Sequence, residues 1–177
     1  MKIRINNKII FETFHHNIFE LDLKKHDINI SSLKMNEITE NNIEEVGNAI
    51  GNTTKKWIKN KYPYVKGFFF TDAMHNNVGS CWIMFKGGNE KLYKVRKHES
   101  LIFRLGVEEK YRGLGYSKEI LNSVVYYLKT KDINNTCLDC STKNHIANNL
   151  YMSFGFKKIK RIFFVRLFNR NIPYFSL

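Results

Sequence analysis

Hydrophobic positions in the second half of the chain predict a strand, a glycine-rich turn and a helix in succession. The apolar run at residues 101–105 is typical of a buried strand. Beyond the turn, residues 118–130 place apolar side chains on one helix face at 3.6-residue spacing, namely Ile120, Leu121, Val124, Val125 and Leu128. Another β-rich run follows at residues 136–141. A strand, a helix and a strand in this order predict a parallel crossover pair.

The first half of the chain carries two hairpin patterns. Residues 1–14 alternate apolar and polar positions around a turn at Asn6 and Asn7. Residues 65–73 and 78–86 form the second pattern, joined by a short polar turn. Antiparallel strands that continue into the strand near residue 101 are therefore expected.

Between these hairpins the pattern changes period. Residues 28–35 predict a short strand, and residues 39–50 predict a helix with its apolar positions on one face. A second short helix around Trp57 ends before Pro63, because the residue before a proline disfavours helical backbone.

The last part of the chain predicts a capped helix and two strands. Asn144 is placed to cap the N-terminus of this helix, and Gly155 to end it. Residues 156–160 and 162–168 are β-rich. The whole pattern predicts an α/β (α+β) fold with a mixed, strongly twisted central sheet of about six to seven strands and helices on both faces. Residues 1–27 form an N-terminal β extension in this interpretation, and residues 28–177 form the main domain.

Composition agrees with one globular domain. The chain has 177 residues, of which 43% are hydrophobic, enough for a sizeable core. No apolar run is long enough to cross a bilayer, and the N-terminus lacks the features of a signal peptide, so a cytoplasmic location is expected. The net charge of +13 favours anionic partners.

The three cysteines predict neither a disulfide framework nor a metal site. Cys137 and Cys140 are three residues apart in a predicted strand, so their side chains point to opposite faces. No second pair accompanies them. Buried, reduced thiols and no metal are therefore expected for these two residues and for Cys81.

The turn at residues 107–117 has the chemistry of a phosphate site. Gly113 and Gly115 accept positive φ without a steric clash, so consecutive N–H groups can point inward. The N-terminus of the following helix adds unpaired N–H groups and the positive end of its dipole. Arg112 stands beside the turn, where a guanidinium can bind a phosphate oxygen.

At two places the chain resembles the GNAT superfamily of acyl-CoA-dependent N-acetyltransferases. Their motif Gln/Arg-x-x-Gly-x-Gly/Ala is matched at residues 112–117, with Ser117 in place of the last Gly or Ala. Residues 144–156 match the second signature, Asn-x-x-Ala-x-x-Leu-Tyr followed after three residues by Gly-Phe. A Rossmann dinucleotide site would need a third glycine where Lys118 stands.

The resemblance implies an acetyl-CoA site and an acetyl transfer to a primary amine by direct attack. By this resemblance the cofactor-binding residues are Leu105, Gly106, Val107, Arg112, Gly113, Leu114, Gly115, Tyr116, Ser117 and Asn144. Gly106 interrupts a β-rich run, which is typical of a bulge. In the family, the pantetheine arm of the cofactor lies beside such a bulge, and a bulge N–H polarises the thioester carbonyl.

Tyr151 matches the position of the family's general acid, although its place on the apolar helix face also suits a packing tyrosine. Glu99 is the candidate base by its position before the strand. Asp72, Glu108 and a water relay are the alternatives. Acceptor-pocket candidates are Trp57, Tyr62 and Tyr64.

Other functions stay open at this level. A basic nucleic-acid-binding module would use the charge and the run at residues 68–70, and a non-catalytic CoA-binding module would use the glycine turn alone. The acceptor is a small molecule, a protein N-terminus or a lysine side chain. A homodimer is among the open oligomeric states.

Overall fold

The computed structural model describes all residues except 1, 6–7, 44–63, 91–92, 168–169 and 176–177. The chain divides into two compact units. The first unit comprises Met1–Leu21, Glu90–Tyr93 and Cys137–Leu177, and the second comprises Asp22–Asn89 and Lys94–Thr136. Each is described by itself below.

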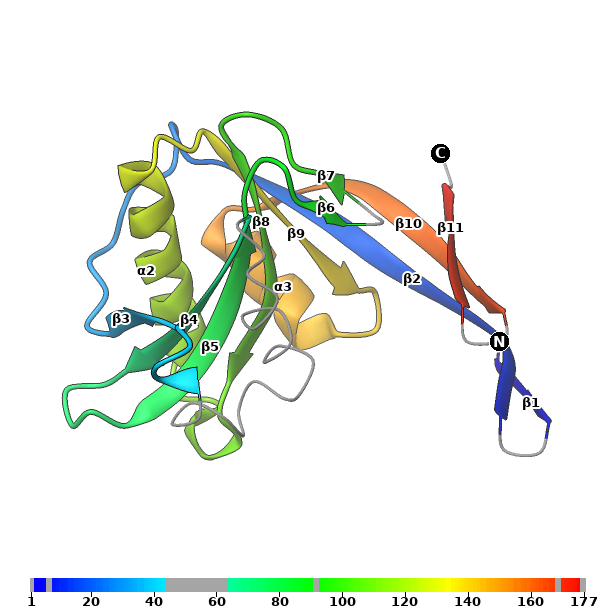
Figure 1. Cartoon of the computed structure of the whole chain (residues 1–177), viewed down its shortest axis with the longest axis horizontal. Helices are drawn as coiled ribbons and strands as arrows, with labels where there is room; N and C mark the ends of the chain where they lie inside the picture. The colour runs from blue at the N-terminus through cyan, green and yellow to red at the C-terminus, as the bar shows by residue number, and fades with distance from the viewer. Residues whose placement is uncertain (1, 6–7, 44–63, 91–92, 168–169, 176–177) are drawn as a thin grey trace. The chain divides into compact units, whose positions relative to one another are not determined.

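Antiparallel strands form the sheet of the second unit, in the order β8 (Glu99–Val107), β5 (Asn77–Met84), β4 (Val65–Thr71) and β3 (Lys34–Glu37) (Figure 1). The β4–β5 hairpin places Phe68 opposite Cys81. Phe68 and Phe70 point into the core with 3% and 0% exposure. The predicted second hairpin is confirmed.

Helix α2 (Tyr116–Thr130) packs on β5 and β8 with the apolar face that its sequence predicts. Ile120, Leu121, Val124 and Leu128 are all fully buried. The contact is close at Gly79, where an added Cβ would lie 2.4 Å from the Gly106 carbonyl oxygen and 2.9 Å from Ile120. A glycine on β5 therefore lets the helix and β8 approach this closely.

Strands β8 and β9 (Asn135–Ser141) begin side by side. The N–H groups of Asn134 and Asn135 donate to the His98 carbonyl oxygen, at 2.8 and 3.3 Å. Two residues further along, the hydroxyl of Ser100 donates to the hydroxyl of Thr136 at 2.8 Å. Both contacts advance in the same direction along the chain, as the predicted parallel crossover requires.

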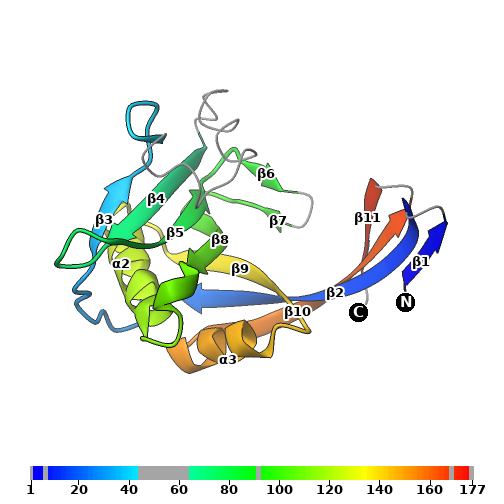
Figure 2. The ribbon, with the colours of Figure 1, turned by 90° about the horizontal axis from the view of Figure 1, so that it is seen from below.

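In the first unit, β2 (Lys8–Asp22) lies between β9 and β10 (Lys157–Leu167), and β11 (Arg170–Phe175) follows β10 (Figure 2). Strand β1 (Lys2–Ile5) pairs with β2 in antiparallel register, which confirms the N-terminal hairpin. Helix α3 (His145–Phe154) contacts β10 and buries Tyr151 and Phe154.

Two sequence predictions differ from the structure. The strand expected at residues 28–35 is only β3, because the N–H groups of Ser32 and Leu33 donate to the side chains of Glu119 and Ser31 instead of to a neighbouring strand. The two strands expected at the end are one strand, β10, which runs through the exposed Arg161 with a register shift beside Lys158. Strand β11 was not predicted. The helices expected at residues 39–50 and near Trp57 lie mostly outside the described residues.

Candidate functional site

The glycine turn connects β8 to α2 through a short 3₁₀ helix, η1 (Glu109–Tyr111). Gly113 and Gly115 have φ values of 82° and 85°, as the sequence predicts. Gly115 is the N-cap of α2 and supplies no side chain to the helix end. A Cβ at either glycine would meet nothing within 4 Å, so their backbone faces open space. The positive φ alone requires glycine here.

Backbone donors of this turn are unpaired within the described part of the chain. Arg112 N–H donates to Glu109 at 3.2 Å, and the next backbone donor with a partner is Lys118, whose N–H bonds Gly115 at 3.0 Å. The N–H groups of residues 113–117 between them make no hydrogen bond to any described residue. Such donors at the positive end of a helix form a site for an anion.

Side chains around the turn leave it open. Arg112 is exposed, and its Nε lies 3.4 Å from the Val107 carbonyl oxygen. Leu114 is 66% exposed. The Tyr111 and Tyr116 rings meet edge to face at 5.9 Å and flank the turn. Ser117 is half-buried in the first turn of α2.

Strand β8 contains the expected bulge, but its position differs from the prediction. Phe103 pairs with Trp82 and Gly106 pairs with Ser80, so the extra residue lies at Arg104 and Leu105. Arg104 has a φ of 49°, whereas Gly106 has no positive φ. The exposed Arg104 side chain allows this left-handed backbone at a cost of about 1–2 kcal/mol. The bulge at Arg104 was not predicted, because the prediction rested on the position of a glycine in the strand.

Tyr151 lies on α3, in the first unit, while the glycine turn belongs to the second. Its side chain is 7% exposed, and its ring contacts those of Phe19 at 5.7 Å and Phe156 at 5.9 Å. These contacts fix the plane of the phenol. The predicted catalytic residue is therefore also a core residue.

Asn144 forms the N-cap of α3, as predicted. Its Oδ1 accepts from the N–H of Ala147 at 3.1 Å. At the other end of the helix, Gly155 has a φ of 110°, and its N–H donates to the Met152 carbonyl oxygen. The side chain of Asn144 thus caps the N-terminus of α3, and Gly155 ends the helix.

The candidate bases are held in different ways. Glu99 lies at the start of β8, roughly 16 Å along the strand from the bulge, and accepts from the N–H of Arg96 at 3.0 Å. Hydrogen bonds from the Asn76 side chain and from the N–H groups of Asn76 and Met74 hold the pKa of the exposed Asp72 carboxyl below its ordinary value. Asp72 therefore closes the β4–β5 turn and is a weak base.

Glu108 follows β8 directly, and its N–H donates to Val78 at 2.9 Å. Of the acceptor-pocket candidates, Tyr64 is 44% exposed and its ring lies against Gly87. Trp57 and Tyr62 lie outside the described residues.

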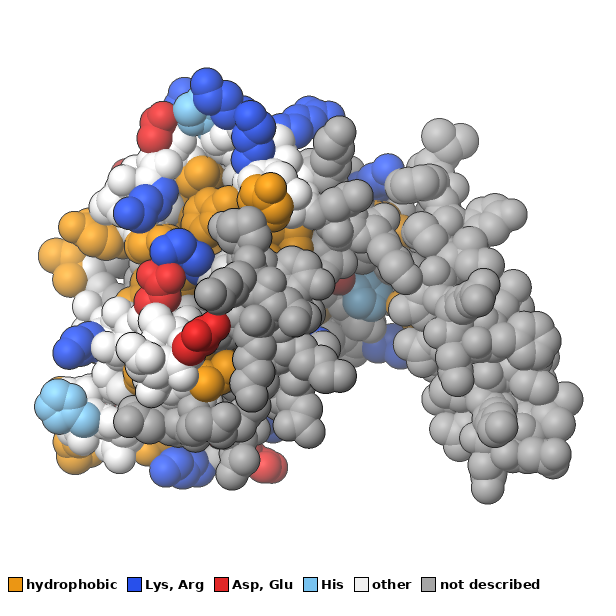
Figure 3. Space-filling view, viewed as in Figure 1, with side chains coloured by type: hydrophobic (Ala, Val, Ile, Leu, Met, Phe, Trp, Pro, Cys, Tyr) orange, Lys and Arg blue, Asp and Glu red, His pale blue; other side chains and the backbone are white. Residues whose placement is uncertain are grey.

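The described residues give little support to a nucleic-acid-binding function. Phe68 and Phe70 are buried and Phe69 packs against the Trp82 cluster, so this run offers no ring for stacking on a base. On the face seen in Figure 3, basic side chains gather near the turn that precedes β8 and otherwise lie among acidic and apolar ones.

All three cysteines are free and buried, as expected. The described residues contain no group of three or more His, Cys, Asp or Glu side chains that could hold a metal ion. None of the described helices has the length and apolar character to cross a bilayer.

A family model for the acetyltransferase (GNAT) family matches residues 38–156, more than half of the chain and including the turn, the bulge and α3. The chain belongs to the GNAT acetyltransferase family. GNAT relatives include mouse N-acetyltransferase 8B, 32% identical over 103 residues that cover 52% of this chain and 44% of the mouse protein. Another is the [ribosomal protein bS18]-alanine N-acetyltransferase of Haemophilus ducreyi, 33% identical over 61 residues, which cover 34% of this chain and 42% of that protein. The chain thus spans less than half the length of these curated relatives.

Solved structures share the fold of this GNAT protein. A GCN5-related N-acetyltransferase from Sphaerobacter thermophilus has a TM-score of 0.65 at 14% identity and covers 92% of this chain and 55% of its own. A GNAT-family acetyltransferase structure from Novosphingobium aromaticivorans has a TM-score of 0.64 at 12% identity, with coverage of 94% and 66%. The mixed α/β fold and the family expected from the sequence are confirmed.

Proposed function

We propose that the protein transfers an acetyl group from acetyl-CoA to a primary amine by direct attack of the amine on the thioester. The observation that carries the proposal is the row of unpaired N–H groups at residues 113–117. An anion with several oxygen atoms is the ligand that such a row binds best. The pyrophosphate of coenzyme A is an anion of this kind.

The residues of the turn fit this group. Open space beside Gly113 and Gly115 leaves room for phosphate oxygens close to the backbone. Arg112 is exposed beside the turn and adds a charge-assisted contact. Leu114, Tyr116 and Ser117 take part through their N–H groups.

The bulge in β8 supports a role in holding the reacting end of the substrate. A bulge turns backbone N–H and carbonyl groups away from the ladder, and Arg104 holds this one in a strained conformation. We assign Leu105 and Val107 to the pantetheine amides and a bulge N–H at Leu105 or Gly106 to the thioester carbonyl oxygen. There the N–H stabilises the negative charge that develops during attack.

Proton transfers complete the reaction. The amine must lose a proton before or during attack, and the departing thiolate must gain one. Tyr151 is the proposed acid, since Phe19 and Phe156 hold its ring in one orientation. Glu99, named as the base from the sequence, remains a candidate. Its bond to Arg96 makes a water relay an equal alternative.

The acceptor is proposed only as a primary amine. One relative is named as an N-acetyltransferase for an alanine of ribosomal protein bS18, so an alanine-terminated peptide belongs among the candidates. Small amines and a lysine side chain are the others. The cytoplasmic location and the homodimer stay predictions.

Release of free CoA thiol tests the proposal. The protein is incubated with acetyl-CoA and, in turn, with an alanine-terminated peptide, a lysine peptide, spermidine and an aminoglycoside. Acceptor-dependent thiol release, with the acetylated amine identified by mass spectrometry, is the expected result.

Two results would favour the alternatives. Tight CoA binding with no thiol release above the rate in buffer, for every amine, would indicate a non-catalytic CoA-binding module. Failure to bind CoA together with salt-sensitive binding of RNA or DNA would indicate a nucleic-acid-binding module.

A further inference from the structure

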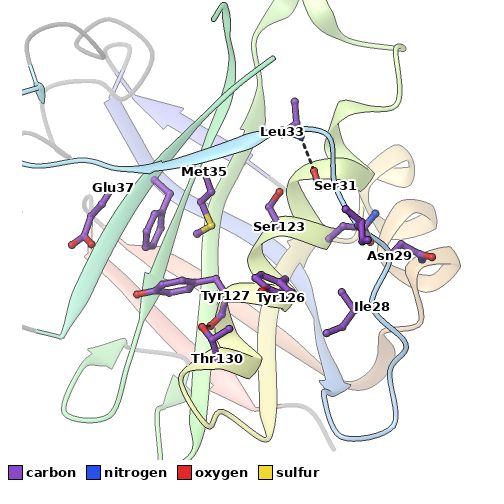
Figure 4. Close-up of a pocket in the computed structure, with 13 residues that line it drawn as sticks. Ile28, Asn29, Ser31, Leu33, Met35, Glu37, Ser123, Tyr126, Tyr127 and Thr130 are labelled. Carbon is purple, nitrogen blue, oxygen red and sulfur yellow. Dashed lines mark hydrogen bonds between the residues drawn. The ribbon is translucent and has the colours of Figure 1, made fainter. Parts of the chain in front are cut away.

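A cavity of about 650 Å³ lies within the second unit, away from the residues assigned above (Figure 4). One wall is the face of α2 from Asn122 to Thr130, and the opposite wall is β3 with the irregular segment at residues 28–33. Phe68 of β4 forms the floor. A volume of this size is typical of small-molecule sites.

The walls are mainly apolar. Leu33 and Phe68 are 7% and 3% exposed, and Met35 projects into the space in Figure 4. Of the described residues that line the cavity, none is a lysine, arginine or histidine, and Glu37 is the one that carries a charge. The ammonium of Lys66 binds the Glu37 carboxylate at 2.8 Å. The cavity therefore favours an uncharged occupant.

Two buried polar side chains interrupt the apolar wall. Asn122 is 4% exposed and Ser123 is 8% exposed, and the Ser123 hydroxyl is buried without a hydrogen-bond partner among the described residues. A serine in a helix commonly donates to a carbonyl of the preceding turn, as Ser153 does to Leu150 at 2.9 Å. Ser123 does not, and its hydroxyl projects from α2 towards the 28–33 segment (Figure 4). Buried polar groups normally find partners, so the Ser123 hydroxyl points to a missing one, and the Asn122 amide lies beside it.

The 28–33 segment is tied at its ends and open between them. The ammonium of Lys129 donates to the His26 carbonyl oxygen at 2.6 Å, and the N–H of Ser32 donates to Glu119 at 3.0 Å. Between these contacts Ile28 is 38% exposed and Ile30 is 95% exposed. Two apolar side chains that line the cavity are thus exposed to solvent.

The cavity is separate from the glycine turn. Asn122 lies about two helical turns beyond Gly115, roughly 10 Å along the axis of α2. Among the described residues, none of those assigned to coenzyme A, to proton transfer or to the acceptor lines it.

We propose that this cavity is a second ligand site, for a neutral small molecule with an apolar body and one amide or hydroxyl group. The apolar body lies against Leu33, Met35 and Phe68. The polar group bonds the Asn122 amide and the Ser123 hydroxyl. Ile28 and Ile30 cover the bound molecule from the rim.

A matched set of probes tests the site in the full chain: 2-naphthamide, 2-naphthoate and naphthalene. We expect 2-naphthamide to shift the ¹H–¹⁵N resonances of residues 28–33 and 122–127, with the carboxylate and the hydrocarbon binding at least fivefold more weakly. Ser123→Ala and Asn122→Leu should each weaken 2-naphthamide by about fivefold, the scale of one hydrogen bond. Ser153→Ala, a helical serine that has its partner, should leave this affinity unchanged.

The variants remain informative if binding is weak, because Ser123→Ala removes a buried unsatisfied hydroxyl and should leave the melting temperature the same or higher. Equal binding of all three probes, shifts confined to other residues, or unchanged affinity in both variants would overturn the proposal. Saturating CoA should not displace 2-naphthamide. Displacement would mean that the cavity belongs to the acetyl-transfer site, whereas loss of CoA binding alone would overturn only the proposed function.

Discussion

The N-termini of the two described helices that carry the family motifs are built in opposite ways. Helix α2 starts at Gly115, a left-handed residue without a side chain, and the N–H groups before it have no partner among the described residues. Helix α3 starts at Asn144, whose side chain accepts from Ala147. One end is left open for an anion, and the other is closed by the chain.

The residue at the N-cap decides whether the N–H groups of a helix end are bound by the chain or left for a ligand. Four N–H groups at any helix start need partners. An Asn cap satisfies one of them and stabilises the helix by about 0.5–2 kcal/mol. A glycine cap leaves the same groups for a ligand, and stability is then gained only when the ligand binds. In the proposed function, α3 contributes the buried Tyr151 side chain to the reaction instead of its N-terminus.

The largest expected effect is that of Gly115→Val. A β-branched residue disfavours the φ of 85° found here, so the N–H groups of the turn move away from a common target. Loss of two charge-assisted hydrogen bonds corresponds to roughly 100-fold weaker CoA binding or more, measured by calorimetry. His75→Val is the matched control, since His75 has a φ of 63° in the β4–β5 turn and should lower stability without weakening CoA. If Gly115→Val binds CoA within threefold of the wild-type affinity, the N-terminus of α2 does not bind the cofactor as proposed.

Tyr151→Phe tests whether α3 acts through its side chain. The ring contacts with Phe19 and Phe156 survive this change, so stability and KM for acetyl-CoA should stay nearly the same. We expect kcat on a verified acceptor to fall roughly tenfold to 100-fold, because a thiolate leaves with little help from an acid. Full turnover in Tyr151→Phe, with Tyr151→Ala unfolded, would make the residue purely structural.

Arg112→Ala separates the charge of the turn from its backbone. The glycine backbone remains, so CoA should still bind, about tenfold more weakly, as expected for one charge-assisted contact. A salt titration of the affinity should show a shallower dependence than wild type. The role assigned to Arg112 fails if the affinity and its salt dependence are both unchanged.

Asn144→Ala removes the side-chain cap at the N-terminus of α3. Loss of the bond to Ala147 should lower the free energy of unfolding by about 1 kcal/mol, measured by urea denaturation. Asn144→Asp keeps the cap and should keep the stability. CoA affinity decides the remaining question, since a loss comparable to that of Arg112→Ala would support the predicted contact between Asn144 and the cofactor.

The smallest expected effect is at Cys140, beside the start of α3. Burial, with a further contribution from Asp139, raises the pKa of its thiol to about 11, and burial also raises the pKa of Cys81. Because the folded thiol stays protonated below this value, iodoacetamide at pH 8 should leave the native protein unlabelled. Mass spectrometry should show labelling only after unfolding in urea. Rapid labelling of Cys140 in the native state would mean that this end of the first unit is open.

Sequence reasoning found both helix ends because each depends on local chemistry. Gly113, Gly115 and Gly155 have the positive φ values that their positions predict, and Asn144 makes the predicted bond. The bulge was placed at Gly106 instead of Arg104, because its position is fixed by the pairing of β8 with β5 and no local signal marks it.

Long-range contacts explain why the sequence did not predict the irregular segment at residues 28–33 or the cavity. Residues 28–33 have a β-like pattern, yet Glu119, far along the chain, accepts the N–H that a strand would use. The cavity beside Asn122 and Ser123 has no sequence signature. Both residues are polar positions on a helix, and only the packing of the 28–33 segment beside them shows that they are buried.

We propose that the uncapped N-terminus of α2, and not the capped N-terminus of α3, binds the anionic part of coenzyme A. A titration of the ¹⁵N-labelled protein with CoA, followed by ¹H–¹⁵N correlation spectra, tests it most directly. We expect the largest amide shifts at residues 113–117, with the N–H resonance of Ala147 nearly unchanged because Asn144 already binds it. Shifts concentrated at the start of α3, with residues 113–117 unmoved at saturation, would contradict it.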